Sequence, residues 1–233
     1  MKKLLLSAIS CTLFNIGITT NADAALVTYT DQATFSSAIN VGTTINFDTD
    51  ANGNAIPTNT IIDQQYIALG ADFNPFSNGT PTASSPGTTQ YASVIPPLSG
   101  ANILQTTGIP NVDGGFEVIF TNAVSGVGIY IGGLHDLSYG ITTFEIFDSS
   151  NSLIGSYNLA NEIGSSPYGY LFFGVTSSTE ISKLQINVGD SDFVWFDDLQ
   201  YSQTISSVPV PAAFWLFCSG LIAFFGAAKR NKT

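Results

Sequence analysis

The sequence predicts an all-β protein whose main domain, residues 25–201, is an antiparallel β-sandwich with one short N-terminal helix. Apolar residues alternate with period two along many short segments, Gly, Asn, Ser and Pro bound these segments, and helical periodicity is scarce. The predicted strands are Leu26–Thr30, Thr43–Phe47, Ile61–Phe73, Phe116–Phe120, Val127–Ile131, Ile141–Phe147, Leu153–Leu159, Ile181–Val188 and Phe193–Tyr201.

The predicted helix is Asp31–Ile39, between the first two strands. Either Thr30 or Asp31 is a suitable N-cap, since both side chains accept hydrogen bonds from free backbone N–H groups. Phe35 and Ile39 lie one turn apart, so they share a face that is expected to pack on the sheet.

Turn-forming residues separate the later strands. Asp148–Ser152 predicts the turn of a hairpin. Asn74–Gly100 contains five prolines and is predicted to be a long loop without a central strand. Residues 202–207 are predicted to be a polar linker. In Phe116–Phe120, alternate side chains beginning with residue 116 are expected to face the core.

Residues 1–24 are predicted to be a signal peptide. Two lysines at positions 2 and 3 precede the apolar stretch Leu4–Ile18, and small residues suited to signal peptidase follow. The residues of the predicted cleavage site are Ala22, Ala24 and Ala25.

Residues 212–228 are predicted to form a single transmembrane helix. The segment is uncharged, and at ~1.5 Å per residue it covers about 25 Å, which is the short end of the membrane-spanning range. Lys229, Arg230 and Lys232 follow it. Because basic flanks stay cytoplasmic, the main domain is expected outside the inner membrane.

Between these ends the chain is strongly acidic. Residues 25–211 contain 16 acidic residues and one basic residue, Lys183, for a formal charge of −15. Nucleic acid is therefore excluded as a partner, since phosphate binding needs clustered Lys and Arg. Both cysteines, Cys11 and Cys218, lie in the terminal segments, so the main domain is expected to fold without disulfides.

An acidic loop after Phe47 predicts a calcium site. Its residues 48–53 fit the pattern D-x-[DN]-x-[DN]-G, although Asn59 stands where an EF-hand has glutamate. Further carboxylates are expected from the region of residues 190–198. The predicted ligands are Asp48, Asp50, Asn52, Asp197 and Asp198. The alternative is a turn held by Asx hydrogen bonds.

Catalytic chemistry has little support in the sequence. His135, followed by Asp136, is the only histidine, and the main domain has neither cysteine nor arginine. We therefore expect no enzyme. The alternative is a secreted polysaccharide-acting hydrolase, which single substitutions at Glu117, Glu145 or His135 would test. Aromatic residues available for stacking on sugars are Tyr130, Tyr139, Tyr157, Tyr168, Tyr170 and Trp195.

The C-terminal tail, residues 208–233, resembles the PEP-CTERM sorting signal of exopolysaccharide-producing Gram-negative bacteria. The resemblance covers a V-P-x-P motif, the uncharged segment and the basic end, although Val210 stands where the usual motif has glutamate. It implies processing by a membrane-embedded exosortase. The residues that carry it are Val208, Pro209, Val210, Pro211, Lys229 and Arg230.

The main domain resembles, more loosely, the galactose-binding-type jelly rolls that are attached to such tails. The resemblance rests on short segments at residues 47–53, 65–73 and 196–199. It implies a jelly-roll-like sandwich in a surface or extracellular-matrix protein with a non-catalytic, carbohydrate-binding or structural role. The expected path is an inner-membrane-anchored precursor that reaches the cell surface or matrix.

Overall fold

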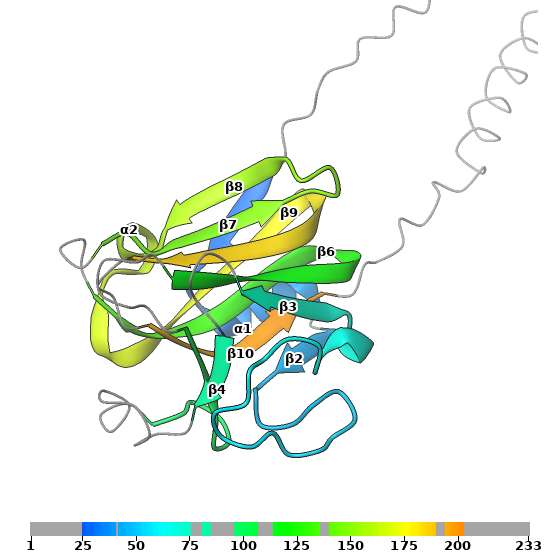
Figure 1. Ribbon diagram of the computed structural model, residues 1–233. Coiled ribbons are helices and arrows are strands. Elements are labelled where there is room, and N and C mark those ends of the chain that lie inside the picture. The colour runs from blue at the N-terminus through cyan, green and yellow to red at the C-terminus, as the bar shows by residue number, and fades with distance from the viewer. Residues whose placement is uncertain are drawn as a thin grey trace, which may run out of the picture.

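The computed structural model describes residues 25–40, 42–75, 81–84, 96–106, 114–135, 140–189 and 194–202. Antiparallel strands dominate it, as predicted, and helices are few (Figure 1). The elements are β1 (Leu26–Tyr29), α1 (Gln32–Ile39), β2 (Thr43–Ile45), the 3₁₀ helix η1 (Ile67–Leu69), β3 (Ala71–Pro75), β4 (Pro81–Ser84), β5 (Ile103–Thr106), β6 (Gly114–Leu134), β7 (Thr143–Phe147), β8 (Leu153–Asn158), α2 (Leu159–Ile163), β9 (Ser166–Val188) and β10 (Trp195–Tyr201).

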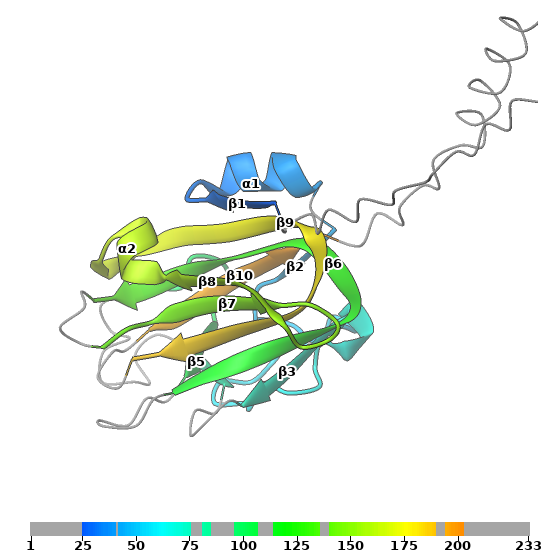
Figure 2. The same cartoon turned by 90° about the horizontal axis from the view of Figure 1, so that it is seen from above.

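The strands form a sandwich of two layers because β6 and β9 are long enough to take part in both (Figure 2). The first layer has the order β3-β6-β9-β7-β8 and uses the N-terminal half of β6 with the C-terminal half of β9. The second layer has the order β4-β5-β10-β6-β9-β1, and β2 also pairs with β10. The β6–β9 register shifts between Ile119 and Gly126, where the chain passes from one layer to the other.

The hydrophobic core fills the space between the layers. Phe116, Val118 and Phe120 are 0%, 0% and 4% exposed, which confirms the alternation predicted for this strand. Phe144 and Ile146 on β7 face the same core. The residues between them along each strand therefore point outward, onto the surface of the first layer.

Helix α1 begins where the sequence predicts. Oδ1 of Asp31 accepts hydrogen bonds from the backbone N and Oγ1 of Thr34 at 2.8 and 2.7 Å, and the Thr34 hydroxyl lowers the pKa of Asp31. Phe35 and Ile39 are buried against Phe172, so α1 covers the outer face of the second layer.

The hairpin predicted around Asp148–Ser152 is confirmed by the pairing of β7 with β8. Oδ1 of Asp148 accepts hydrogen bonds from the backbone N of Ser150 at 2.8 Å and of Ser152 at 2.9 Å. The carboxylate thus holds the turn together.

The predicted strand Ile61–Phe73 is wrong in its first part, since only Ala71 onward pairs with β6. The amide of Gln65 accepts from the backbone N of Asp63 at 2.7 Å and donates to the carbonyl of Ile61 at 2.8 Å. These local bonds satisfy backbone groups that a strand would have to pair, and η1 follows.

Other boundaries also differ from the prediction. Phe116–Phe120 and Val127–Ile131 belong to one strand, β6, and β9 begins 15 residues before Ile181. Leu159 starts α2 instead of ending a strand, because the side chain of Asn158 caps the helix by accepting from the backbone N of Asn161. The predicted single helix is therefore corrected to two α-helices among the described residues.

The loop predicted at Asn74–Gly100 is also partly wrong. β3 extends to Pro75, and β4 lies inside the segment. β4 pairs only with β5 at the end of the strand order, which agrees with the rule that proline-containing strands lie at sheet edges. The short strand β5, Ile103–Thr106, was not predicted.

The signal peptide, residues 203–207 of the predicted linker, and the tail with its transmembrane helix lie outside the described residues. Ser202, the first residue of the predicted linker, is buried, and its backbone N donates to the carbonyl of Gly126 at 3.1 Å. No helix among the elements named above is long and apolar enough to span a membrane. The jelly-roll strand order stays a prediction.

Candidate functional site

Polar side chains make up most of the outer surface of the first layer, which we call the polar face; Ile119 and Phe147 also lie at its outward-facing positions. They occupy the strand positions that alternate with core residues. The polar face consists of Asp72 and Asn74 on β3, Glu117 on β6, Lys183, Gln185 and Asn187 on β9, Thr143 and Glu145 on β7, and Ser156 and Asn158 on β8.

Five of these residues form one row across the sheet. Glu117 is opposite Asn74 on one side and Gln185 on the other. Glu145 is opposite Gln185 and, on its other side, Ser156. Because neighbouring strands lie ~4.8 Å apart, the row is about 19 Å long. Gln185, at the centre of the row, is only 8% exposed, so an extended ligand would mainly meet the carboxylates of Glu117 and Glu145 and the outer groups of Asn74 and Ser156.

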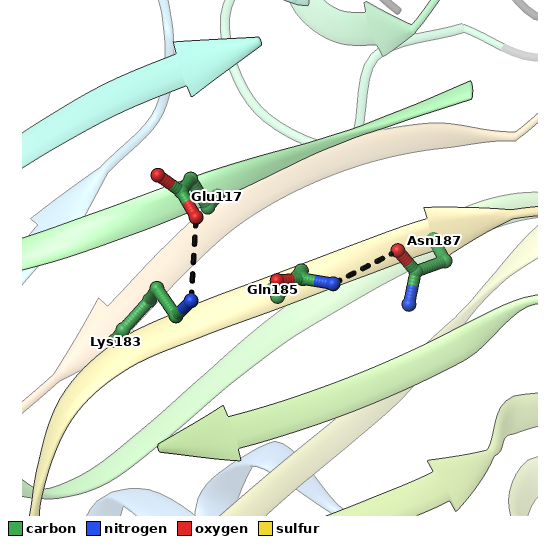
Figure 3. Close-up of polar contacts among 4 residues, drawn as sticks. All are labelled: Glu117, Lys183, Gln185 and Asn187. Atoms are coloured by element: carbon green, nitrogen blue, oxygen red, sulfur yellow. Dashed lines mark hydrogen bonds and ion pairs between the residues drawn. The ribbon is translucent and has the colours of Figure 1, made fainter. Parts of the chain in front are cut away.

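Hydrogen bonds hold the amide side chains at the centre of the polar face (Figure 3). Nε2 of Gln185 donates to Oδ1 of Asn187 at 3.1 Å. Nδ2 of Asn187 donates in turn to Oγ1 of Thr143 at 2.8 Å. Each amide oxygen accepts up to two hydrogen bonds, and the Thr143 hydroxyl keeps a proton to donate. The network thus presents further donors and acceptors in fixed positions.

An ion pair flanks this network (Figure 3). Nζ of Lys183 lies 3.5 Å from Oε2 of Glu117, and the two side chains are 16% and 23% exposed. The same ammonium lies 4.1 Å from the centre of the Phe147 ring. The ammonium group of Lys183 thus forms an ion pair with Glu117 and a cation–π contact with Phe147.

Glu145 lies on the other side of Gln185. Its Oε1 accepts a hydrogen bond from Oγ of Ser156 at 3.1 Å. Within the part of the chain that the structure describes, no basic residue forms an ion pair with Glu145. Its carboxylate therefore gives this side of the polar face a net negative charge.

A hollow of about 530 Å³ lies beside the network at the start of β7. The hollow is shallow and open to solvent. Among the described residues, Glu145 is its one charged lining residue, and the 56% exposed Ile141 forms an apolar wall. The lining residues are Gly140, Ile141, Thr143, Glu145, Asn187, Val188 and Gly189.

The predicted calcium loop is held by hydrogen bonds within the protein. Oδ1 of Asp50 accepts from the backbone N of Asn52 at 2.8 Å and of Asn54 at 2.9 Å. Oδ2 of Asp50 accepts from Nδ2 of Asn54 at 2.9 Å, and this bond lowers the pKa of Asp50. These are the Asx bonds that were the alternative to calcium.

Asp48 reaches away from its own loop to residues 100–102. Its Oδ1 accepts from the backbone N of Ala101 at 2.7 Å and of Asn102 at 2.9 Å. Gly100 is required beneath it, because a Cβ there would lie 1.5 Å from Oδ2 of Asp48. The carboxylate anchors the chain just before β5.

Asp197 and Asp198 reach the same segment from β10. Oδ2 of Asp197 accepts from the backbone N of Leu98 at 2.9 Å and of Ser99 at 3.1 Å, and Oδ1 of Asp198 accepts from Oγ of Ser99 at 2.7 Å. Burial of Asp197 outweighs these donors and raises its pKa to about 7. The structure thus brings Asp48, Asp197 and Asp198 together around one loop.

Among the described residues, no group of three or more His, Cys, Asp or Glu side chains is arranged to hold a metal ion. Calcium binding therefore stays a prediction.

The aromatic candidates that the structure describes do not lie on the polar face. Trp195 is 3% exposed and packs with Ile103 and Tyr170, while Tyr168 is 79% exposed at the start of β9. Tyr139 and Asp136 lie outside the described residues, and His135 directly follows β6. The other aromatic candidates, Tyr130, Tyr157 and Tyr170, are partly buried.

Sequence reasoning did not identify Thr143, Gln185 or Asn187. One sequence signal could have found Gln185 and Asn187. When the apolar residues of Ile181–Val188 are assigned to the core, the polar residues between them must face outward. Of the predicted processing residues, only Ala25 is described; Ala22, Ala24 and the sorting motif are outside.

No family model matches this chain, and no curated protein matches it. Among solved structures, it is similar to the K2 cleaved adhesin domain of Lys-gingipain, with a TM-score of 0.44 and 12% identity over 69% of this chain and 99% of that chain. It is also similar to a family 29 carbohydrate-binding module, with a TM-score of 0.37 and 12% identity over 73% and 99% of the two chains. A family 11 module from a Clostridium thermocellum cellulosomal cellulase gives 0.32 and 8% over 64% and 97%. Similarities at this level do not show what this chain binds.

Proposed function

We propose that this chain is an exported surface or extracellular-matrix protein whose sandwich domain binds polysaccharide through the polar face, without catalysis. The observation that carries this proposal is the hydrogen-bonded network of Gln185, Asn187 and Thr143 beside a hollow of about 530 Å³. Sugar hydroxyls both donate and accept hydrogen bonds, and the network offers both kinds of partner. The row about 19 Å long suits a chain of several sugars.

The route to the surface rests on the two ends of the sequence. The features of residues 1–24 support cleavage by signal peptidase before Ala25. The resemblance of residues 208–233 to a PEP-CTERM tail supports an inner-membrane precursor and recognition by an exosortase. A polysaccharide-binding domain delivered this way would act in the extracellular matrix.

Binding is tested with the full-length chain in detergent on arrays of neutral oligosaccharides. Asn187→Ala is expected to weaken binding about tenfold, since a ligand loses hydrogen bonds to the amide. Asn161→Ala on α2, away from the polar face, is the matched control. Absence of any glycan binding, or equal binding by both variants, overturns the proposal. Lost biofilm cohesion in a deletion strain without glycan affinity would indicate a structural role instead.

A second candidate is hydrolysis of polysaccharide. Glu117 and Glu145 lie on either side of Gln185 in one row, two strand spacings or about 10 Å apart at the backbone. Inverting glycosidases use carboxylates separated by roughly 6.5–9.5 Å. Release of reducing ends that is abolished by Glu117→Gln and by Glu145→Gln would favour this candidate over binding alone.

A further inference from the structure

The hollow beside Glu145 carries a negative charge that no described basic side chain neutralises. Within the ranges that the structure describes, Glu145 is the one charged side chain that lines it. The nearest base in the register, Lys183, is held 3.5 Å from Glu117 and over the ring of Phe147. A ligand group that enters the hollow therefore meets an unneutralised carboxylate.

The remaining polar groups of the hollow complement a cation with neighbouring hydroxyls. Oδ1 of Asn187 keeps acceptor capacity after its bond from Gln185, and the Thr143 hydroxyl has a proton to donate. Ile141 and Val188 supply apolar contact. An ammonium group donates three hydrogen bonds and accepts none. It therefore fits a site whose main hydrogen-bond partners are a carboxylate and an amide oxygen.

Anionic ligands are disfavoured by the same surface. Glu117, Glu145 and Asp72 face outward on the polar face, and Lys183 is the one lysine or arginine of residues 25–211. A uronic-acid chain lying along the row would place like charges together without a free cation to offset them.

We infer that the hollow beside Glu145 binds the ammonium group of an amino sugar, so that the polar face prefers polysaccharides with free amines to neutral or uronic-acid polysaccharides. This inference rests on the proposed function. It adds the charge of the ligand, which the hydrogen-bonding network alone leaves open.

The test compares three oligosaccharides of equal length by calorimetry at a pH of about 6, where the amine is protonated: glucosamine oligomers, N-acetylglucosamine oligomers and mannuronate oligomers. The glucosamine oligomer is expected to bind about tenfold more tightly than the acetylated one, and more weakly at high salt. Mannuronate is expected not to bind.

Glu145→Gln, which keeps the shape of the side chain, is expected to remove the advantage of the amine, so that the variant binds the glucosamine and the acetylated oligomers with equal affinity. Glu180→Gln is the control, since it removes the same charge from an exposed position outside the polar face. Equal affinity for both neutral and amine oligomers overturns this inference and leaves the proposed function standing. Binding of neither overturns both.

Discussion

Gly128 on β6 lies directly opposite Gly174 on β9, and the ring of Phe35 from α1 packs against both. A Cβ at Gly128 would lie 2.6 Å from Cζ of Phe172 and 2.9 Å from Cε1 of Phe35. The glycine pair thus lets α1 approach the outer face of the second layer, and α1 occupies that face.

Gly128→Ala is expected to destabilise the fold by about 1–3 kcal/mol, because a rigid ring must move from a packed site. Denaturant unfolding measures this cost. In a Phe35→Ala background the Phe35 ring is gone and the Phe172 ring has room to move, so the same substitution is expected to cost less. An equal cost in both backgrounds would show that Phe35 does not limit the space.

Because the pKa of Asp197 is raised, we expect the free energy of unfolding to fall as the pH rises. Burial raises its pKa to about 7 from the ordinary 3.8, so between these values the folded state holds a proton that the unfolded state has lost. The free energy of unfolding is therefore expected to be larger near the bottom of that window than above its top. Asp197→Asn, which cannot titrate, should flatten this part of the profile. An unchanged profile in the variant would assign the pH dependence to other groups.

Calcium is expected to raise the melting temperature if the predicted ligands Asp48, Asp50, Asn52, Asp197 and Asp198 include a metal site. The hydrogen bonds of Asp48 and Asp197 to backbone N–H groups compete with that role. Thermal unfolding in EDTA and in added calcium measures the difference, with magnesium as the control. A melting temperature that none of these additions moves would remove the hypothesis.

Processing at both ends is expected in the native host. Mass spectrometry of the mature protein should find Ala25 as the first residue and a C-terminus near Val208–Pro211, with any attached group. An intact chain recovered from the cytosol would contradict both export and sorting.

Local sequence determined the elements whose geometry is set within a few residues. Asp31 caps α1 through Thr34, and Asp148 closes the β7–β8 turn through Ser150 and Ser152. The alternation of Phe116, Val118 and Phe120 fixed a core-facing side of β6. Each of these features depends on contacts or periodicity within one short segment.

Strand limits were harder to predict because burial changes along one strand. In β9, Phe173 faces the core while Phe172 lies under α1, so this part is apolar on both faces and lacks the alternation that marks Lys183–Val188. β5 begins with two adjacent buried apolar residues and does not alternate. Both are stabilised by pairing with strands distant in sequence.

The sequence by itself determined a strand-rich, acidic domain between two apolar ends, because composition, alternation and turn residues are local properties. Only the tertiary structure decided that Glu117, Gln185 and Glu145 share one row, since register between separate strands selects which outward residues meet. It likewise decided that Asp48 and Asp197 converge on one loop and bind its backbone N–H groups. A carboxylate is identifiable from sequence, but its partner is set by packing of distant segments.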